Sequence, residues 1–235
     1  MPTQFELTPG ISRGDSDERA VLQRMIEPGH CYVKDRGYAK FMLFNAIHAA
    51  QSNYVCRLRD ISNLRIIEER TLTAEDGEAE VLQDAIVELG VTAKPATRPD
   101  HQVRLLVVRC TPHEKRGKTG GGSSGPASTD TLLIATDMLD APAWVIALIY
   151  CYRWSIEIFF RFFKHVLGCR HLLSHDPVGI EIQTYCAIIA CMLISLWTGR
   201  KPTLRTYEMI CYYFTGLADE EELLAHLAKL QKYDA

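Results

Sequence analysis

The order of predicted elements in residues 31–60 constrains the fold most. CYVKD (31–35) is typical of a strand, the turn DRGY (35–38) follows it, and apolar residues at helical spacing come next. NYVCRLRD (53–60) then alternates like a second strand. This strand, turn, helix, strand order is typical of an α/β fold. It places Asp35 at the carboxyl end of a strand, where ligand-binding and catalytic groups of such sheets gather.

Three segments make up the predicted organisation. Residues 1–60, which also contain a short helix at 17–27, form a partial α/β core. Residues 61–136 hold short β-branched runs between polar turns, and are predicted to be a strand-rich insertion. Residues 137–235 form a helical remainder. Within these segments we expect a flexible Gly/Ser-rich loop at 113–130, a strand at 131–137, and helices at 141–168, 178–198, 203–215 and 219–231.

Composition excludes several classes of protein. With 47% hydrophobic and 23% charged residues, the chain is typical of a soluble globular protein rather than a disordered one. The longest apolar stretch, 185–197, has 13 residues, fewer than the roughly 20 that a membrane-spanning helix needs. The first residues carry no secretory signal, so we expect a cytoplasmic protein without membrane contact. The eight cysteines include no Cys-x-x-Cys pair and are predicted to be reduced thiols.

The predicted helix at 141–168 carries the most informative side chains. Asp140 is its expected N-cap and Gly168 its end. At 100° per residue, one arc of this otherwise apolar helix collects five polar side chains: Tyr150, Arg153, Glu157, Arg161 and Lys164.

Two interpretations of the carboxylates are open. A carboxylate on a buried helix is costly unless it is paired or bound to a metal. Glu157 therefore either forms structural ion pairs with Arg153 and Arg161 or acts as a functional group. Asp35 is either a turn residue or a ligand. Two carboxylates with nearby basic residues suit Mg²⁺ and phosphate chemistry, because Mg²⁺ is commonly held by one or two carboxylates plus substrate phosphates.

The spacing of four of these residues resembles a known family. Tyr150, Arg153, Glu157 and Lys164 match in every position the Tyr-Arg-Glu-Lys signature of DDE-type transposases of bacterial insertion sequences, family four. The DRGY turn at 35–38 resembles the second-Asp motif of that family, and residues 61–136 resemble its insertion.

The resemblance implies a fold and an activity. The fold is a ribonuclease H-like core, in which three carboxylates bind two Mg²⁺ ions, or Mn²⁺ as a substitute, to cut and rejoin transposon-end DNA. Asp35 is the implied second carboxylate and Glu157 the third, and both are implied metal ligands. Tyr150, Arg153, Lys164 and Arg36 are implied to contact DNA. The implied partners are double-stranded DNA, at transposon ends and target, and a second copy in a homodimeric synaptic complex.

One part of the family pattern has no match. The first catalytic Asp of the family lies on an early strand, but Asp15 and Asp17 lie in a polar stretch that leads into a helix. PTQFELTPG (2–10) resembles the third strand of the sheet. We therefore expect the chain to lack the first two strands and the first Asp, and to be inactive alone. The alternative is a noncatalytic DNA-binding or transposase-interacting remnant.

Other interpretations fit less well. A hydrolase of small phosphoesters leaves the positions of Tyr150 and Lys164 unexplained. A nucleotide-binding P-loop ending at 117–119 lacks its first glycine, where Pro112 stands. Three histidines near residue 170 are not at ligand spacing and are predicted to have surface or packing roles: His165, His171 and His175. The three tryptophans are predicted to be core residues rather than base-stacking residues: Trp144, Trp154 and Trp197.

Overall fold

The computed structural model divides the chain into two compact units. One comprises residues 10–153, and the other residues 1–9 with 154–235. The structure describes residues 6, 8, 14–59, 63–110, 131–153, 156–157, 173–199 and 204–231. The predicted strand at 2–10 and the predicted loop at 113–130 lie outside these residues, apart from two positions of the strand.

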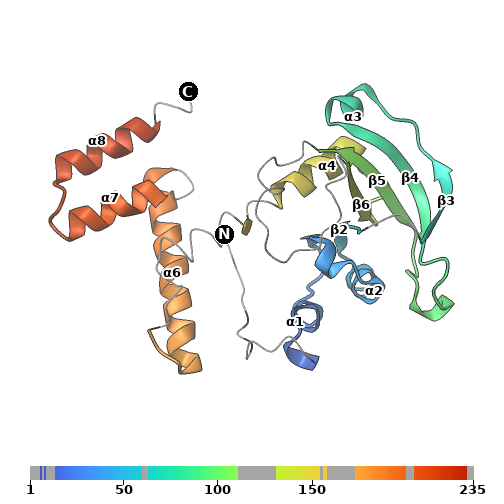
Figure 1. The fold of residues 1–235 in the computed structure, drawn as a ribbon, viewed down its shortest axis with the longest axis horizontal. Helices are drawn as coiled ribbons and strands as arrows, with labels where there is room; N and C mark the ends of the chain where they lie inside the picture. The colour runs from blue at the N-terminus through green and yellow to red at the C-terminus, as the bar shows by residue number, and fades with distance from the viewer. Residues whose placement is uncertain are drawn as a thin grey trace, which may run out of the picture. The chain divides into compact units, whose positions relative to one another are not determined.

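The first unit is built around the predicted strand, helix, strand segment (Figure 1). β1 (Cys31–Lys34) and β2 (Asn53–Arg57) run parallel, and α2 (Phe41–Ala49) connects them. Phe44 of α2 is fully buried and its ring stacks on that of Tyr54, with ring centres 4.3 Å apart. The helical spacing of apolar residues thus became a buried face, and this prediction is confirmed. The predicted helix at 17–27 is also confirmed, as α1 (Glu18–Arg24).

The predicted strand-rich insertion continues the same sheet. It contributes four strands: β3 (Leu64–Glu69), β4 (Val81–Leu89), β5 (Val103–Arg109) and β6 (Thr131–Thr136). Neighbouring strands of this group pair antiparallel, and β6 also pairs antiparallel with β2. The order of the six-stranded sheet is β1-β2-β6-β5-β4-β3. The mixed α/β fold class is confirmed, while the three-part domain division stays a prediction.

Two hydrophobic clusters cover the two faces of the sheet, because successive strand residues point to opposite sides. On one face, Tyr54 and Leu105 pack with Phe44 of α2. On the other face, Val55 and Ile134 pack with the second helix, α4 (Ala143–Tyr152). The sheet is therefore enclosed between α2 and α4.

The start of α4 differs from the sequence prediction. Its N-cap is Pro142, which offers no side-chain hydrogen bond, and not Asp140. The carboxylate comes instead from the short helix α3 (Ala74–Glu78), where Asp76 Oδ1 accepts a 2.8 Å hydrogen bond from the Trp144 backbone N–H. Burial raises the pKa of Asp76, but hydrogen bonds from Thr73 and from the Trp144 backbone N–H outweigh burial, so the pKa is lowered.

A buried ion pair fixes the turn before α4. Arg104 of β5 binds both carboxylate oxygens of Asp84 on β4, each at 2.7 Å. The same guanidinium donates to the carbonyl oxygens of three residues in the turn: Met138, Leu139 and Ala141. Both partners are almost fully buried, so removing either would leave an uncompensated charge.

The helix predicted over 141–168 is confirmed only in part. α4 ends at Tyr152 with Arg153 as its C-cap, and Ile156 and Glu157 are helical again. Residues 154–155 and 158–172 lie outside the described residues. The division between the two units falls directly after Arg153.

Among the described residues from 173 onward, the second unit contains the helices α6 (Pro177–Thr198), α7 (Leu204–Phe214) and α8 (Glu220–Gln231). Asp176 caps α6 by accepting from the backbone N–H of Val178, and Gly199 ends it in the left-handed conformation with φ of 66°. The three predicted helices are confirmed within a few residues. By length and composition alone α6 could cross a membrane, a test that the core helix of a soluble protein also passes.

Candidate active site

Asp35 lies at the carboxyl end of β1, as predicted. It is the N-cap of a short 3-10 helix, η2 (Arg36–Tyr38), and its Oδ1 accepts a 2.7 Å hydrogen bond from the Arg36 backbone N–H. Asp35 follows Val33 by two residues, and Val33 packs in the α4 cluster. By strand alternation the carboxylate therefore belongs to the α4 face of the sheet. Asp35 and Arg36 are both half-buried.

Two predicted site residues of α4 contact each other. Tyr150 is 7% exposed, and its hydroxyl accepts a hydrogen bond from the Arg153 side chain. The Arg153 Cζ atom lies 5.7 Å from the centre of the Tyr150 ring. Since tyrosine and arginine three residues apart share one side of a helix, the signature spacing produces this contact directly.

Electrostatic effects on Tyr150 show which charged groups lie around it. Burial raises the pKa of Tyr150, and Arg153 opposes this shift. Asp35 raises the pKa further, whereas Arg57 lowers it. Asp35, Arg57, Tyr150 and Arg153 thus gather on the α4 face at the carboxyl ends of β1 and β2.

Arg57 is a member of this group that sequence reasoning missed. It ends β2 and is half-buried. Val55, two residues earlier, packs in the α4 cluster, so alternation puts Arg57 on the same face. The parallel register pairs Lys34 with Cys56 and so brings the next residues, Asp35 and Arg57, to adjacent positions. A sequence argument that compared the two strand ends could have found it.

The other predicted site residues are not part of this geometry. Glu157 is half-buried and belongs to the second unit. Lys164 lies outside the described residues. The structure therefore brings together three of the six predicted residues, Asp35, Tyr150 and Arg153, with Arg36 beside the first.

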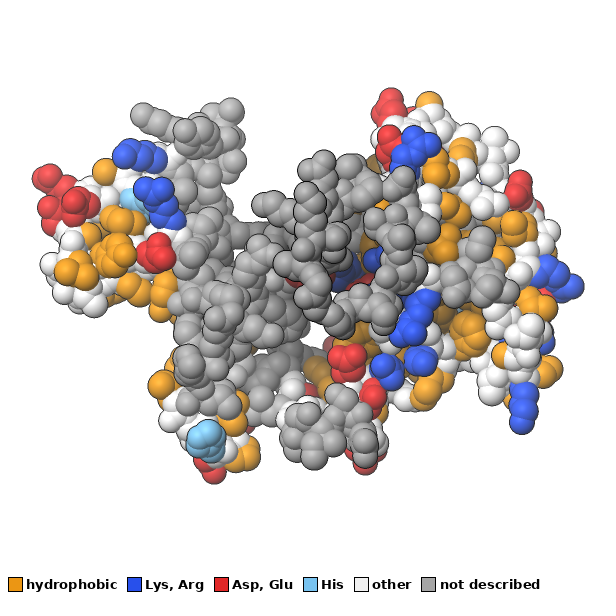
Figure 2. Space-filling view, in the orientation of Figure 1, with side chains coloured by type: hydrophobic (Ala, Val, Ile, Leu, Met, Phe, Trp, Pro, Cys, Tyr) orange, Lys and Arg blue, Asp and Glu red, His pale blue; other side chains and the backbone are white. Residues whose placement is uncertain are grey.

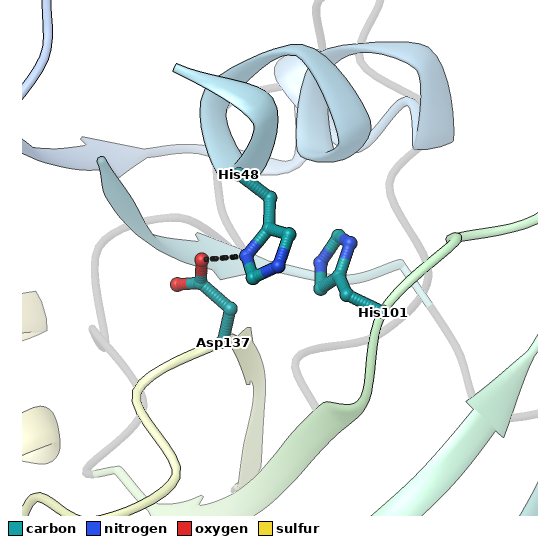
Figure 3. Close-up of side chains that lie close together, drawn as sticks. All are labelled: His48, His101 and Asp137. Carbon is teal, nitrogen blue, oxygen red and sulfur yellow. Dashed lines mark hydrogen bonds and ion pairs between the residues drawn. The ribbon is translucent and has the colours of Figure 1, made fainter. Parts of the chain in front are cut away.

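A second cluster, His48, His101 and Asp137, was not predicted (Figure 3). His48 comes from α2, His101 from the loop before β5, and Asp137 follows β6. The Asp137 carboxylate is buried and accepts 3.0 Å hydrogen bonds from His48 Nδ1 and from the Tyr54 backbone N–H. Because β6 is antiparallel to β2, this cluster lies at the opposite end of β2 from Arg57.

The histidine cluster does not fit Mg²⁺. Mg²⁺ prefers oxygen ligands, and the two imidazole rings stack face to face, with centres 4.1 Å apart and planes 15° apart. The ligand atoms of the three residues lie within 4.8 Å of one another, close enough to hold a metal ion that accepts imidazole ligands, which Mg²⁺ does not prefer. Both His101 nitrogens also have partners, Tyr54 Oη at 3.0 Å and Asp100 Oδ1 at 2.9 Å. The cluster joins α2 to the insertion, and its members are too far apart in sequence to give a spacing signal.

Asp35 fits a divalent ion better. Its carboxylate is half-buried at a strand end, and carboxylate oxygens are the ligands that Mg²⁺ prefers. Among the described groups that act on Tyr150, Asp35 is the one acid, beside two arginines. The two arginines suit phosphate oxygens but repel a cation, so a divalent ion at Asp35 requires further carboxylates beside it.

The chain belongs to the transposase DDE domain family, which matches residues 2–193. Members of this family generally use divalent metal ions. The six-stranded mixed α/β sheet is consistent with the ribonuclease H-like fold of such transposases.

Two relatives are named as transposases. A Sinorhizobium fredii protein, y4zB, is 28% identical over 172 residues, which cover 73% of this chain and 43% of that protein. A Geobacillus stearothermophilus protein, named for insertion sequence element IS5377, is 23% identical over 195 residues, which cover 83% of this chain and 45% of that protein. The chain thus spans less than half the length of either relative.

Proposed function

We propose that this protein is the part of a family-four DDE transposase that carries the second and third catalytic carboxylates, Asp35 and Glu157. Its reaction is Mg²⁺-dependent cleavage and transfer of DNA strands, with Mn²⁺ as a substitute. The observation that carries the proposal is the gathering of Asp35 with Arg57, Tyr150 and Arg153 at one end of the sheet, in a chain of the DDE family.

Each side chain of the candidate site has a role in this proposal. Asp35 and Glu157 would hold divalent ions, which supply an activated attacking oxygen and stabilise the leaving one. Arg153 and Arg57 would bind phosphate oxygens of the DNA, with Lys164 and Arg36 as further contacts. The buried Tyr150 hydroxyl holds the Arg153 guanidinium in place. These contacts position the duplex and read no sequence.

The first carboxylate is proposed to come from a strand alongside β1. β1 is an edge strand of the described sheet, so its outer backbone groups are available to another strand. Asp15 lies in a 3-10 helix and Asp17 is the N-cap of α1, so neither is on a strand. The 235-residue chain alone is then expected to be inactive.

The second candidate is a noncatalytic DNA-binding or transposase-interacting remnant. The positions of Asp15 and Asp17 outside the described strands favour it, because neither takes the place on an early strand that the first carboxylate of the family needs. In both candidates the proposed partners are double-stranded DNA and a second copy of the chain, without membrane contact. The cytoplasm stays the proposed compartment on the basis of sequence alone.

One assay separates the two candidates. It measures Mg²⁺- or Mn²⁺-dependent nicking of a transposon-end duplex by this chain and by one extended upstream to the first Asp. The proposed function predicts nicking by the extended protein only. Binding without nicking by both proteins would favour the remnant. Nicking by the short chain, lost in Asp15→Asn or Asp17→Asn, would show that the first carboxylate is misplaced here.

A further inference from the structure

α6 exposes an apolar stripe along its length. Six residues form it, each between 41% and 78% exposed: Val178, Ile182, Tyr185, Ile189, Met192 and Leu196. Trp197, predicted to be a core residue, is 53% exposed beside it, and Trp144 of α4 is 37% exposed, so the prediction is wrong for both, while Trp154 lies outside the described residues. Figure 2 shows hydrophobic side chains on the surface over the lower end of this helix.

The opposite side of α6 is already buried. Ala187, Ile188 and Ile194 are each less than 10% exposed. At 100° per residue Ala187 and Ile194 lie on the arc facing away from the stripe, together with the buried Thr198. Ile188 borders the stripe next to Met192. The stripe is therefore a second apolar face of α6, additional to the one that packs within the structure.

The size of the stripe matches a protein interface. An aromatic side chain has an area of roughly 150–250 Å² and an aliphatic one somewhat less, so the eight residues at about half exposure, counting Leu193 and Trp197, present on the order of 700 Å². The largest patch on a typical monomer is only about 300–600 Å². A standard interface takes about 800 Å² from each partner.

The spacing of the stripe selects a helix as its partner. Successive stripe residues are separated by four, three, four, three and four positions. This alternation of three and four is the seam of a two-helix coiled coil. α6 has one charged residue within its bounds, Glu181, so two copies could face each other without like-charge repulsion along the seam.

The stripe is also complementary to itself when one copy is reversed. Each stripe residue then faces another about a centre at residue 187: Val178 faces Leu196, Ile182 faces Met192, and Tyr185 faces Ile189 of the second copy. The small Val178 meets the end of the helix that also carries the bulky Trp197. Reversal also places opposite ends of the helix dipoles together.

We propose that the α6 stripe is a homodimer interface, in which α6 packs antiparallel against α6 of a second copy. The stripe would serve the dimer of the proposed function. The test of this interface measures mass and not DNA cleavage. The interface proposal can therefore fail while the proposed function holds, and the proposed function can fail while the interface proposal holds.

The experiment is sedimentation equilibrium on the full chain and on Ile189→Lys. The wild-type chain should have twice the 26.6 kDa mass of one copy. Ile189→Lys should weaken dimerisation by about 100-fold or more, because two lysines per dimer replace buried isoleucines. The matched control is Ile67→Lys on β3, a position 57% exposed against 52% for Ile189, and it should stay dimeric. Circular dichroism checks that both variants keep their helices.

A pair of charge variants tests the orientation. Ile182→Glu alone should dissociate the dimer, and Ile182→Glu combined with Met192→Lys should restore it, because antiparallel packing sets the two new charges opposite each other. If the packing were parallel, the double variant would set Glu against Glu and Lys against Lys, and the chain would stay monomeric.

Three results would overturn the proposal. The first is a monomeric wild-type chain, which would mean that another part of the chain covers the stripe. The second is a dimer or larger species that Ile189→Lys leaves unchanged. The third is flotation of the wild-type chain with phosphatidylcholine vesicles, abolished by Ile189→Lys, which would make the stripe a membrane contact.

Discussion

Replacing Lys34 should stabilise the protein. Lys34 ends β1, directly before Asp35, and is 6% exposed. Its Nζ atom lies 5.2 Å from the centre of the Tyr32 ring and has no hydrogen-bond partner among the described residues. Burial lowers the pKa of Lys34 to about 8, against a small opposing effect of Cys56. The folded state therefore carries an ammonium group that it solvates poorly.

The sign of the pH dependence follows from this lowered pKa. Below pH 8 the group is charged in both states, and the folded state bears the full cost of burying the charge. Between pH 8 and 10.5 the unfolded state binds more protons, so the free energy of unfolding rises with pH. A pKa of about 8 against 10.5 corresponds to about 3 kcal/mol at 1.36 kcal/mol per pH unit.

Lys34→Met keeps the length of the side chain and removes the charge. It should raise the free energy of unfolding by about 2–3 kcal/mol at pH 7, since the ring contact with Tyr32 returns part of the cost. The gain should shrink toward zero as the pH approaches 10.5. Urea unfolding at pH 7 and pH 10 measures it, with the exposed Lys94→Met as control. A destabilised Lys34→Met, or a gain equal at both pH values, would refute the reasoning.

Two further predictions concern the charged clusters. Arg153→Ala should weaken DNA binding similarly at all sequences, and should lower by about one the slope of the logarithm of the binding constant against the logarithm of salt concentration. An unchanged slope with a lower melting temperature would mean that Arg153 only supports Tyr150. Asp137→Asn should lower the free energy of unfolding by about 1–3 kcal/mol, because the amide keeps one acceptor oxygen and cannot accept from both His48 and the Tyr54 backbone N–H as the two carboxylate oxygens do. The upstream-extended protein carrying Asp137→Asn should still cleave DNA with Mn²⁺. If this variant instead loses affinity for Mn²⁺, the catalytic ion belongs to the histidine cluster.

Local patterns predicted the elements around the site. CYVKD at 31–35, the apolar spacing after the DRGY turn and the alternation in 53–60 were sufficient for β1, α2 and β2, because each pattern is set by near neighbours. Tyr150 and Arg153 also meet through their spacing alone. The α4 cap could not be predicted in this way, since its carboxylate comes from Asp76, 68 residues before Trp144.

Long-range pairing explains what the sequence did not reveal. The pairing of β2 with β6 across the insertion decides which residues share a sheet end, and no local pattern encodes it. His48 and Asp137 meet only because of that pairing. Arg57 was within reach of sequence reasoning, since it depends on strand alternation and on one parallel register.

The most direct test of the account measures DNA cleavage by the upstream-extended protein carrying Asp35→Asn or Glu157→Gln. Each variant should lose Mg²⁺- and Mn²⁺-dependent nicking of a transposon-end duplex and keep most of its binding to that duplex, because each removes one carboxylate oxygen ligand and little else. Asp100→Asn, at an exposed acid of the same unit, is the control and should cleave normally. Near-normal cleavage by Asp35→Asn would contradict the central claim that this carboxylate holds the catalytic metal.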